Sequence, residues 1–305
     1  MSRTVAVVDI GSTSIQLTIA DVHSDHIKIR LKEKRIARLA DELDDAGRLS
    51  ARAFAEVENA LVQFQSIVEE VGVALNVTGT ATLRAAKNRE RLLTRIQTQL
   101  GVSIRLLSGA DEARLVLAGV LFGHPELAKE RLLTVDVGGG SSELITGING
   151  RGATIASVPI GSLVVHRKWL GFDQPNWSNV RQARRCLRSR FSNAVQLSRA
   201  VKIDTLVGTG GTIQRLVRLA RGRAMMSDEI DGEWLSLDDI NECIEKLIRA
   251  KSGDARRALP GMDSDRADFI LGGALVYAVV MEGFQASGWR VSTSALRTGM
   301  LTSQP

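Results

Sequence analysis

The chain has 305 residues, of which 44% are hydrophobic, 24% charged and 4% aromatic. These shares match those of soluble globular domains, so disordered and low-complexity fibrous proteins are excluded. The length suggests two domains or one large one. The 40 Lys and Arg residues outnumber the 34 Asp and Glu residues, which gives a net charge of +6. This excess favours a polyanionic partner through electrostatic steering, with a solvated basic surface as the alternative.

The first predicted strand is the apolar, β-branched run at residues 5–8, which is typical of a buried strand. It ends in the polar turn at residues 9–14, and the alternating residues 15–20 predict a returning strand. The sequence therefore predicts a hairpin whose tip carries an acid, a glycine and several hydroxyl groups.

Helices and strands alternate after this hairpin. Apolar residues at spacings of three and four predict an amphipathic helix that begins near Ser50 and ends at Gly72. Strands are expected at residues 73–77 and 102–106, and Ser108 has the spacing of a capping box that begins a further helix.

The pattern of the first hairpin occurs a second time. Residues 132–137 form an apolar strand that contains Asp136, and a Gly-Gly-Gly-Ser-Ser turn and a returning strand follow. An apolar strand followed by Asp-x-Gly thus occurs at both Asp9 and Asp136, which indicates an internal repeat of a whole domain. Asn149-Gly150 predicts another hairpin turn.

A third glycine turn, residues 208–212, follows a strand that begins at Thr205. Three helices and a last strand are then expected, at residues 213–219, 237–250, 263–281 and 290–292. The alternation predicts an α/β fold of two similar lobes. We place the boundary near His124-Pro125, so that the lobes comprise residues 1–124 and 125–305.

Metal-binding and export signals are absent from the sequence. Cys186 and Cys243 lie far apart, and no Cys-x-x-Cys or Cys/His cluster is present. We therefore expect neither a disulfide framework nor a structural zinc site, and a reducing cytosol is the simplest location. Asp9 interrupts the N-terminal apolar run, unlike in a signal peptide. The longest apolar run, residues 269–281, is too short to span a bilayer. We expect a cytoplasmic homodimer without membrane or nucleic-acid partners.

Three short loops rich in Gly, Ser and Thr each follow a predicted buried strand. Glycine permits positive φ and close approach of a ligand, and successive N–H groups with nearby hydroxyls form an anion-binding nest. If the two lobes face each other, Asp9 and Asp136 point into one cleft, where a hydrated Mg²⁺ or a similar cation would link them to phosphate oxygens. The alternative is that the loops are ordinary turns. They match neither a P-loop nor a Rossmann motif.

Together the three loops resemble those of the actin/Hsp70/sugar-kinase superfamily. Within it, the segments at residues 79–84 (Gly-Thr-Ala-Thr-Leu-Arg) and 107–114 (Leu-Ser-Gly-Ala-Asp-Glu-Ala-Arg) resemble the exopolyphosphatase/guanosine pentaphosphate phosphohydrolase family. The segments at 260–262, 266–268 and 296–299 continue the likeness, which covers essentially the whole chain in its short two-domain form. The resemblance implies two ribonuclease H-like lobes that face a central cleft.

The resemblance also implies roles for individual residues. Glu112 matches the acid that activates the attacking water, although its place at a helix start is equally typical of a dipole-compensating acid. Glu143 matches the second acid of the cleft, and we assign Asp9 and Asp136 to the metal. Arg84 is expected to hold phosphate oxygens. The remaining phosphate-binding residues are expected in the loops: Gly11, Ser12, Thr13, Gly138, Gly139, Gly140, Ser141, Gly208, Thr209, Gly210 and Gly211.

Three positions depart from the family pattern. Thr13 stands where Asn is usual, Gln16 where a basic residue is common, and Thr293 where many members have an acid. These departures bear on catalytic strength and substrate preference and not on the fold.

Two arginine runs, residues 181–190 and 215–223, place cations three or four positions apart on predicted helices. Arg184, Arg188, Arg215 and Arg218 would contact a polyphosphate tail or a guanosine polyphosphate. A solvated basic face is the alternative for each run.

We expect a hydrolase that releases terminal orthophosphate from inorganic polyphosphate, with Mg²⁺ and in-line attack by water. Three other functions stay open: removal of the 5′-phosphate of guanosine pentaphosphate, non-catalytic sensing of (p)ppGpp or polyphosphate, and a sugar or carboxylate kinase. The kinase is disfavoured because the chain is short and Glu112 suits a water better than a sugar hydroxyl.

Overall fold

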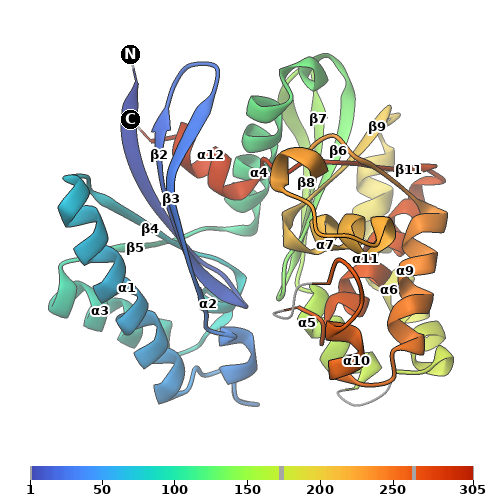
Figure 1. The fold of residues 1–305 in the computed structure, drawn as a ribbon, viewed down its shortest axis with the longest axis horizontal. Helices are drawn as coiled ribbons and strands as arrows, with labels where there is room; N and C mark the ends of the chain where they lie inside the picture. The colour runs from blue at the N-terminus through green and yellow to red at the C-terminus, as the bar shows by residue number, and fades with distance from the viewer. Residues whose placement is uncertain (1, 172–174, 263–265, 305) are drawn as a thin grey trace.

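A computed structural model describes residues 2–171, 175–262 and 266–304. It contains two β-sheets with helices packed against them (Figure 1). The first sheet has the order β3-β2-β1-β4-β5, and the second has the order β10-β11-β9-β6-β7-β8. The α/β fold with two similar lobes is therefore confirmed.

The first lobe is built on the five-stranded sheet. Its strands are β1 (Arg3–Ile10), β2 (Ser14–Val22), β3 (Ile27–Ile36), β4 (Leu75–Gly79) and β5 (Ile104–Leu106). Its helices are η1 (Leu39–Glu42), α1 (Ala51–Val71), α2 (Ala81–Ala85) and α3 (Arg89–Leu100).

The second lobe is built on the six-stranded sheet. Its strands are β6 (Arg131–Val137), β7 (Ser142–Ile148), β8 (Arg151–Val158), β9 (Thr205–Thr209), β10 (Trp234–Ser236) and β11 (Gly288–Val291). Its helices are η2 (Pro125–Lys129), α5 (Ser162–Val165), η3 (His166–Leu170), α6 (Trp177–Arg199), α7 (Gly210–Arg221), α8 (Ser227–Ile230), α9 (Leu237–Arg249), α10 (Gly253–Arg257) and α11 (Ile270–Phe284).

The repeat seen in the sequence is a repeat of sheet topology. β1 pairs antiparallel with β2 and parallel with β4, and β6 pairs in the same ways with β7 and β9. Asp9 accordingly lies opposite Gln16, and Asp136 lies opposite Glu143. The two aspartates therefore occupy equivalent places at the ends of the central strands.

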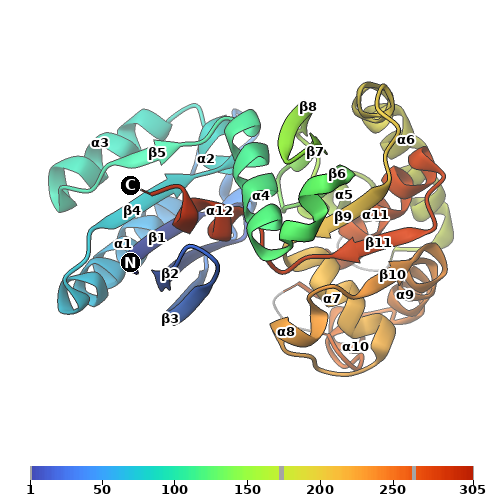
Figure 2. The same cartoon turned by 90° about the horizontal axis from the view of Figure 1, so that it is seen from above.

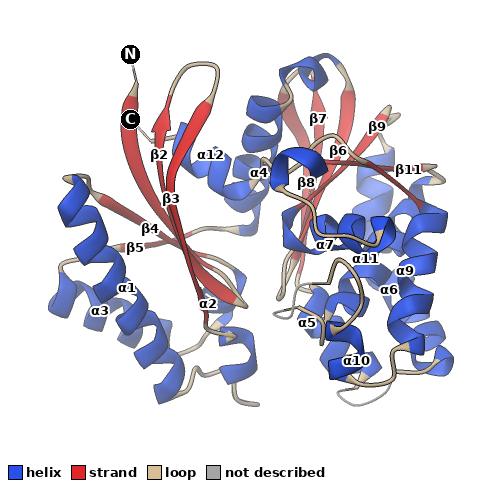
Figure 3. Cartoon of the chain, viewed as in Figure 1, coloured by secondary structure: helices blue, strands red, loops and turns tan. Residues whose placement is uncertain are grey.

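Each sheet buries one face against its own helices. α1 and α3 lie on the outer side of the first sheet, and α6, α9 and α11 lie on the outer side of the second (Figure 3). Phe54, Leu61 and Phe64 lie on one face of α1, which packs into the first core against β2 and β4. Residues 270–281 of α11 are buried on every side, which explains their unbroken apolar sequence.

Two helices lie between the lobes, α4 (Gly109–Gly123) and α12 (Leu296–Thr302), as Figure 2 shows from above. α12 returns from the second lobe to pack its Leu296 and Met300 with Val5 and Val7 of β1. The expected boundary at His124-Pro125 falls between the two sheets in sequence, and the division of the chain at that point stays a prediction.

Several predicted helix caps and turns are confirmed. Ser50 caps α1 by accepting a hydrogen bond from the Ala53 N–H at 3.1 Å, and Gly72 ends it in the left-handed region at φ 74°. The turn at Asn149-Gly150 has positive φ at both residues, as the hairpin pattern predicts. The capping box at Ser236 is also present at the start of α9.

Several predicted elements differ from the structure. The glycine turn expected at 208–212 is the end of β9 followed directly by the first residues of α7, and the last strand is Gly288–Val291 and not 290–292. The strand expected at 73–77 lies at Leu75–Gly79, because the N–H of Val73 still bonds the α1 carbonyl of Val68. The strand expected at 102–106 begins at Ile104, where its pairing with β4 begins. The helix expected from residue 263 begins at Ile270; residues 263–265 lie outside the described residues.

Candidate active site

A cleft of about 390 Å³ lies between the lobes and is lined by both aspartate loops. The first loop contributes Gly11, Ser12 and Thr13, and the second contributes residues 138–141. The two turns are closed by equivalent backbone hydrogen bonds. Gly11 donates its N–H to the carbonyl of Ser14, and Gly138 donates its N–H to the carbonyl of Ser141, both at 3.0 Å. The loops lie against each other: a Cβ on Gly139 would meet the Thr13 methyl at 2.9 Å.

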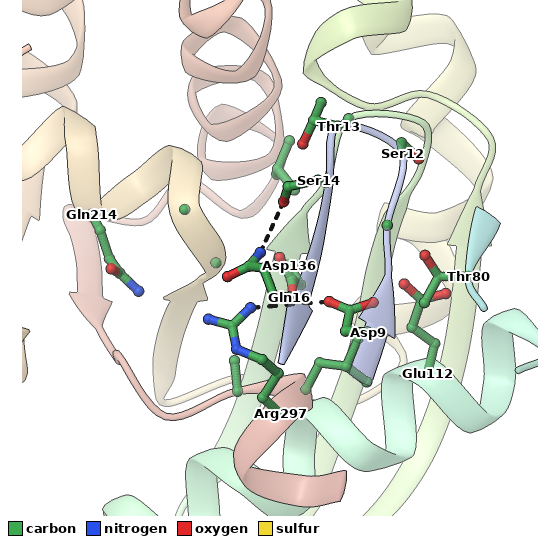
Figure 4. A pocket seen from close by; sticks show the side chains of 18 of the residues that line it. Asp9, Ser12, Thr13, Ser14, Gln16, Thr80, Glu112, Asp136, Gln214 and Arg297 are labelled. Atoms are coloured by element: carbon green, nitrogen blue, oxygen red, sulfur yellow. Dashed lines mark hydrogen bonds and ion pairs between the residues drawn. The ribbon is translucent and has the colours of Figure 1, made fainter. Parts of the chain in front are cut away.

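Four acidic side chains project into this cleft. Asp9 and Asp136 are each the last residue but one of their strands, β1 and β6. Glu143 is the second residue of β7, and Glu112 lies in the first turn of α4. Asp9, Glu112 and Asp136 are labelled in Figure 4, where their carboxylates approach one another. Asp9, Glu112 and Glu143 are all buried, at 8%, 8% and 3% exposed.

Burial of these acids raises their pKa values. Burial raises the pKa of Glu112 to about 9, with further increases from the negative charges of Glu143 and Asp9. Burial likewise raises the pKa of Glu143 to about 7 and that of Asp136 to about 6. The pKa of Asp9 is raised by burial as well, against the opposing effect of Arg297. These shifts favour the neutral acids in the ligand-free cleft, and a cation bound beside them would stabilise their charged forms.

Two arginines lie close to individual acids of the cleft. Arg297 of α12 approaches Asp9 to 4.0 Å, and Arg84 approaches Glu112 to 3.2 Å. The Oδ1 atom of Asp9 is buried, with no hydrogen-bond partner among the described residues. An orphaned buried carboxylate oxygen of this kind is a ready ligand for a hard cation.

The four acids of the cleft suit a metal ion that keeps part of its water shell, and not one whose ligands all come from the protein. In the described part of the chain, no group of three or more His, Cys, Asp or Glu side chains is placed to hold a metal ion. Mg²⁺ commonly binds through one or two carboxylates and keeps waters or phosphate oxygens as its other ligands. Asp9 and Asp136 fit that pattern.

Arg84 occupies a different place from the one expected. It does not line the cleft; its Nη1 atom donates to the Leu107 carbonyl at 2.6 Å and to Glu112 at 3.2 Å. The structure thus places Arg84 against the acid of α4, and a direct hold on phosphate stays a prediction.

The third glycine loop is only partly exposed to the cleft. Gly210 and Gly211 line it, whereas Gly208 and Thr209 lie beneath the lining. Thr209 is fully buried, and its carbonyl accepts a hydrogen bond from the Tyr277 hydroxyl at 2.6 Å. Phosphate binding by these two deeper residues has no support in the geometry.

The two arginine runs lie in different parts of the structure. Arg215 and Arg218 of α7 line the cleft. Arg184 and Arg188 of α6 do not; both form ion pairs with Glu282 of α11, at 2.8 and 2.9 Å. The α6 arginines are therefore not part of the cleft, and their contact with a polyphosphate chain outside it stays a prediction.

The sequence patterns assigned no role to several residues that line the cleft. Arg266 and Arg297 lay within segments that resemble the family, but without an assigned role. Lys32 and Lys34 lie on β3, whose charged sequence showed no strand pattern. Thr80 and Gln214 are among the other polar residues of the lining for which no role was predicted from the sequence.

A protein-family model described as the Ppx/GppA phosphatase family matches residues 18–304. The chain belongs to the Ppx/GppA phosphatase family. Residues 9–14 lie before the matched range, so the first loop is placed by the structure.

The sequences of curated relatives align with nearly the whole length of this chain. Exopolyphosphatase 1 of Mycobacterium tuberculosis is 29% identical over 298 residues, which cover 97% of this chain and 86% of the relative. A putative exopolyphosphatase of Haemophilus influenzae is 27% identical over 302 residues, covering 99% of this chain and 91% of the relative.

Solved structures of the family share the fold. The Aquifex aeolicus PPX-GPPA enzyme is 26% identical, covers 100% of both chains and superposes with a TM-score of 0.84. An exopolyphosphatase from Cytophaga hutchinsonii, at 24% identity, covers 99% of this chain and 97% of its own, with a TM-score of 0.89. Among the described helices of this chain, none has the length and apolar character to cross a membrane.

Proposed function

We propose that this protein hydrolyses inorganic polyphosphate and releases one terminal orthophosphate in each turnover. The observation that carries the proposal is that one cleft of a Ppx/GppA-family chain contains three buried acids, the half-buried Asp136 and two Gly-Ser/Thr loops. The exopolyphosphatase names of the curated relatives support the same substrate.

The loops would hold the terminal phosphoryl group. Gly139, Gly140 and the hydroxyls of Ser12, Thr13 and Ser141 line the cleft, and backbone N–H and hydroxyl groups of this kind bind phosphate oxygens. The N–H of Gly138 is not among them, because it closes the turn by bonding the Ser141 carbonyl. Since Ser12 also accepts a hydrogen bond from Thr82 at 2.8 Å, its hydroxyl oxygen is oriented before substrate arrives.

Asp9 and Asp136 would hold Mg²⁺ or another divalent cation. The ion supplies positive charge that neutralises the phosphate oxygens and draws protons from the neighbouring acids. The unpartnered Oδ1 atom of Asp9 and the raised pKa of Asp136 both support a cation between these side chains.

Glu112 would act as the general base. Its carboxylate takes a proton from a water, the water oxygen bonds to the terminal phosphorus, and the bridging P–O bond breaks in line. The electron pair leaves on the shortened polyphosphate, and the proton returns to solvent when orthophosphate departs. Arg84, 3.2 Å away, holds Glu112 in place and favours its charged form.

Hydrolysis of guanosine pentaphosphate is the alternative substrate assignment. No aromatic ring lines the cleft among the described residues, so a guanine base would lack a stacking surface there. The lining instead includes six cationic side chains: Lys32, Lys34, Arg215, Arg218, Arg266 and Arg297. These features favour the linear polyanion.

The proposal is tested by incubating the purified protein with long-chain polyphosphate and, separately, with guanosine pentaphosphate while released phosphate is measured. Faster release from polyphosphate is expected. Phosphate release from guanosine pentaphosphate alone would make the nucleotide the substrate in place of polyphosphate. Tight binding of either compound without phosphate release would indicate a non-catalytic sensor. Cytoplasmic location and a homodimer stay predictions.

A further inference from the structure

The cleft face of the first sheet carries a row of polar residues that leads outward from Asp9. In the strand register, Asp9 of β1 lies opposite Gln16 of β2, and Gln16 lies opposite Lys34 of β3. Two residues farther along, Thr18 lies opposite Lys32. All five side chains line the cleft, so the two lysines share a sheet face with the catalytic aspartate.

A β-bulge decides which β3 residues reach this face. Ile19 pairs with Leu31 and Ala20 pairs with Ile29, which leaves Arg30 as the extra residue. Because side chains alternate along a strand, one extra residue exchanges the two faces beyond it. Ile29 accordingly lines the cleft with Lys32 and Lys34.

Lys28 lies beyond the bulge on the opposite face. It pairs in register with Asp21, and neither residue is part of the cleft lining. Strict alternation would have placed Lys28, Arg30, Lys32 and Lys34 together, whereas the bulge leaves only the last two in the cleft. Arg30 instead forms an ion pair with Asp21 at 2.7 Å.

Arg297 brings a third cation to the same space. It reaches from α12 to within 4.0 Å of Asp9, and Figure 4 shows it projecting from α12 toward that carboxylate. Partial burial lowers the pKa of Lys32, and the positive charge of Arg297 lowers it further. No ion pair joins Lys32 to an acid within the described residues, so two like charges meet there, an arrangement that an anion would stabilise.

We propose that Lys32, Lys34 and Arg297 form an outer anion subsite that binds the phosphates following the cleaved one in a polyphosphate chain. This subsite rests on the proposed polyphosphate hydrolysis. Lys34 lies two strand spacings from Asp9, which is about 10 Å, so a terminal phosphoryl group held by the acids and loops does not reach it. Lysine ammonium groups on flexible stems are suited to a chain that must advance after each cleavage.

The test is equilibrium binding to Glu112→Gln protein, which would retain substrate without turning it over. Titration calorimetry with long-chain polyphosphate and with pyrophosphate is run at several salt concentrations, with and without the added Lys32→Gln and Lys34→Gln changes. Each phosphate contact that is lost lowers the log–log salt slope by about 1. We expect the double lysine change to lower the slope for long chains by about 1 to 2 and to leave pyrophosphate affinity within about twofold.

Lys28→Gln on the same strand is the matched control, since it removes the same charge from the opposite face. An equal loss of slope with Lys28→Gln would overturn the subsite and indicate a general surface effect. Equal weakening of pyrophosphate would also overturn it, because the lysines would then hold the cleaved phosphate. If the parent protein binds long chains but releases no phosphate, polyphosphate hydrolysis fails while the subsite is still judged by the same titrations.

Discussion

Glu112 is largely protonated at neutral pH in the ligand-free protein, because burial and the nearby charges of Glu143 and Asp9 raise its pKa to about 9. A divalent cation beside these acids would lower that pKa and free the carboxylate to accept a proton from water. Glu112→Gln keeps the size of the side chain but cannot accept the proton. We expect kcat for polyphosphate to fall by at least about 10²-fold.

Phosphate release measures the fall in kcat, and thermal melting followed by circular dichroism shows whether the variant is folded. Glu90→Gln, at an exposed position of α3, is the control and is expected to retain full activity. Near-normal turnover by Glu112→Gln would remove this residue from the mechanism.

Arg84 controls the pH at which Glu112 ionises. A neighbouring guanidinium favours the carboxylate, so Arg84 lowers the pKa of Glu112. Arg84→Gln removes this charge, the pKa rises, and the base is formed only at higher pH. We therefore expect the acid limb of the pH–rate profile to move to higher pH, with the largest activity loss at low pH.

Arg84→Lys is expected to restore part of the profile, since it keeps the charge. Arg114→Gln removes an arginine that pairs with Asp111 on the exposed side of α4, and it is expected to leave the profile in place. A profile that falls uniformly at all pH values, without a shift, would indicate only a structural role for Arg84.

Asp136 belongs to the acids assigned to the metal, and its pKa is raised to about 6 by burial. Asp136→Asn removes one negative ligand. We expect hydrolysis to require a divalent cation and the variant to need a higher concentration of it. Activity is measured against Mg²⁺ concentration, with Asp204→Asn, an ion-pair partner of Arg131, as the control. Full hydrolysis in excess chelator would refute the metal assignment.

At the scale of elements, the crossing of α4 and α12 places Arg297 and Glu112 in one cleft. A Cβ added to Gly299 would meet the Leu115 carbonyl oxygen, and one added to Gly119 would meet that of Ala295. Two backbones thus approach each other without intervening side chains. Only glycine at these positions permits the approach.

Gly299→Ala should therefore push α12 away from α4. We expect the free energy of unfolding to fall by about 1–3 kcal/mol, as for overpacked cores, together with lower activity because Arg297 moves from Asp9. Urea denaturation and phosphate release measure the two effects. Ser303→Ala at the end of the same helix is the control, and unchanged stability in Gly299→Ala would show that the helices separate without cost.

At the scale of the whole molecule, the lobes are also joined beneath the cleft. Arg167 of η3 donates to the Ala40 carbonyl of η1 at 2.5 Å and forms an ion pair with Asp41. Arg38 faces Asp268 across the same junction at 3.6 Å. Ala40, Leu163 and Phe269 form a small apolar cluster there. These contacts favour the closed arrangement of the two lobes.

Arg167→Gln should weaken that closure, since hydrogen bonds to charged groups contribute about 1.5–3 kcal/mol. We expect a larger radius of gyration by small-angle scattering without ligand, and a return to the parent value with polyphosphate bound. Arg131→Gln, which breaks a pair within the second lobe, should leave the radius unchanged. An unchanged radius in Arg167→Gln would show that the crossing helices alone hold the lobes together.

Local patterns in the sequence were sufficient for the repeated hairpins, the capped helices and the acids at the strand ends. The apolar runs before Asp9 and Asp136, the Ser50 and Ser236 caps and the Asn149-Gly150 turn each depend on residues close in sequence. Local backbone preference and burial of a strand determine such features, so the two-lobe α/β fold followed from them.

Long-range packing decided the rest of the site. β3 carries a charged sequence and forms only because β2 offers it an edge, with a bulge that selects Lys32 and Lys34 for the cleft. α12 returns across the molecule to bring Arg297 to Asp9, and α6 turns its arginines to Glu282. These placements depend on pairing and helix contacts between residues far apart in sequence, and no local pattern specifies which face of an element meets which neighbour.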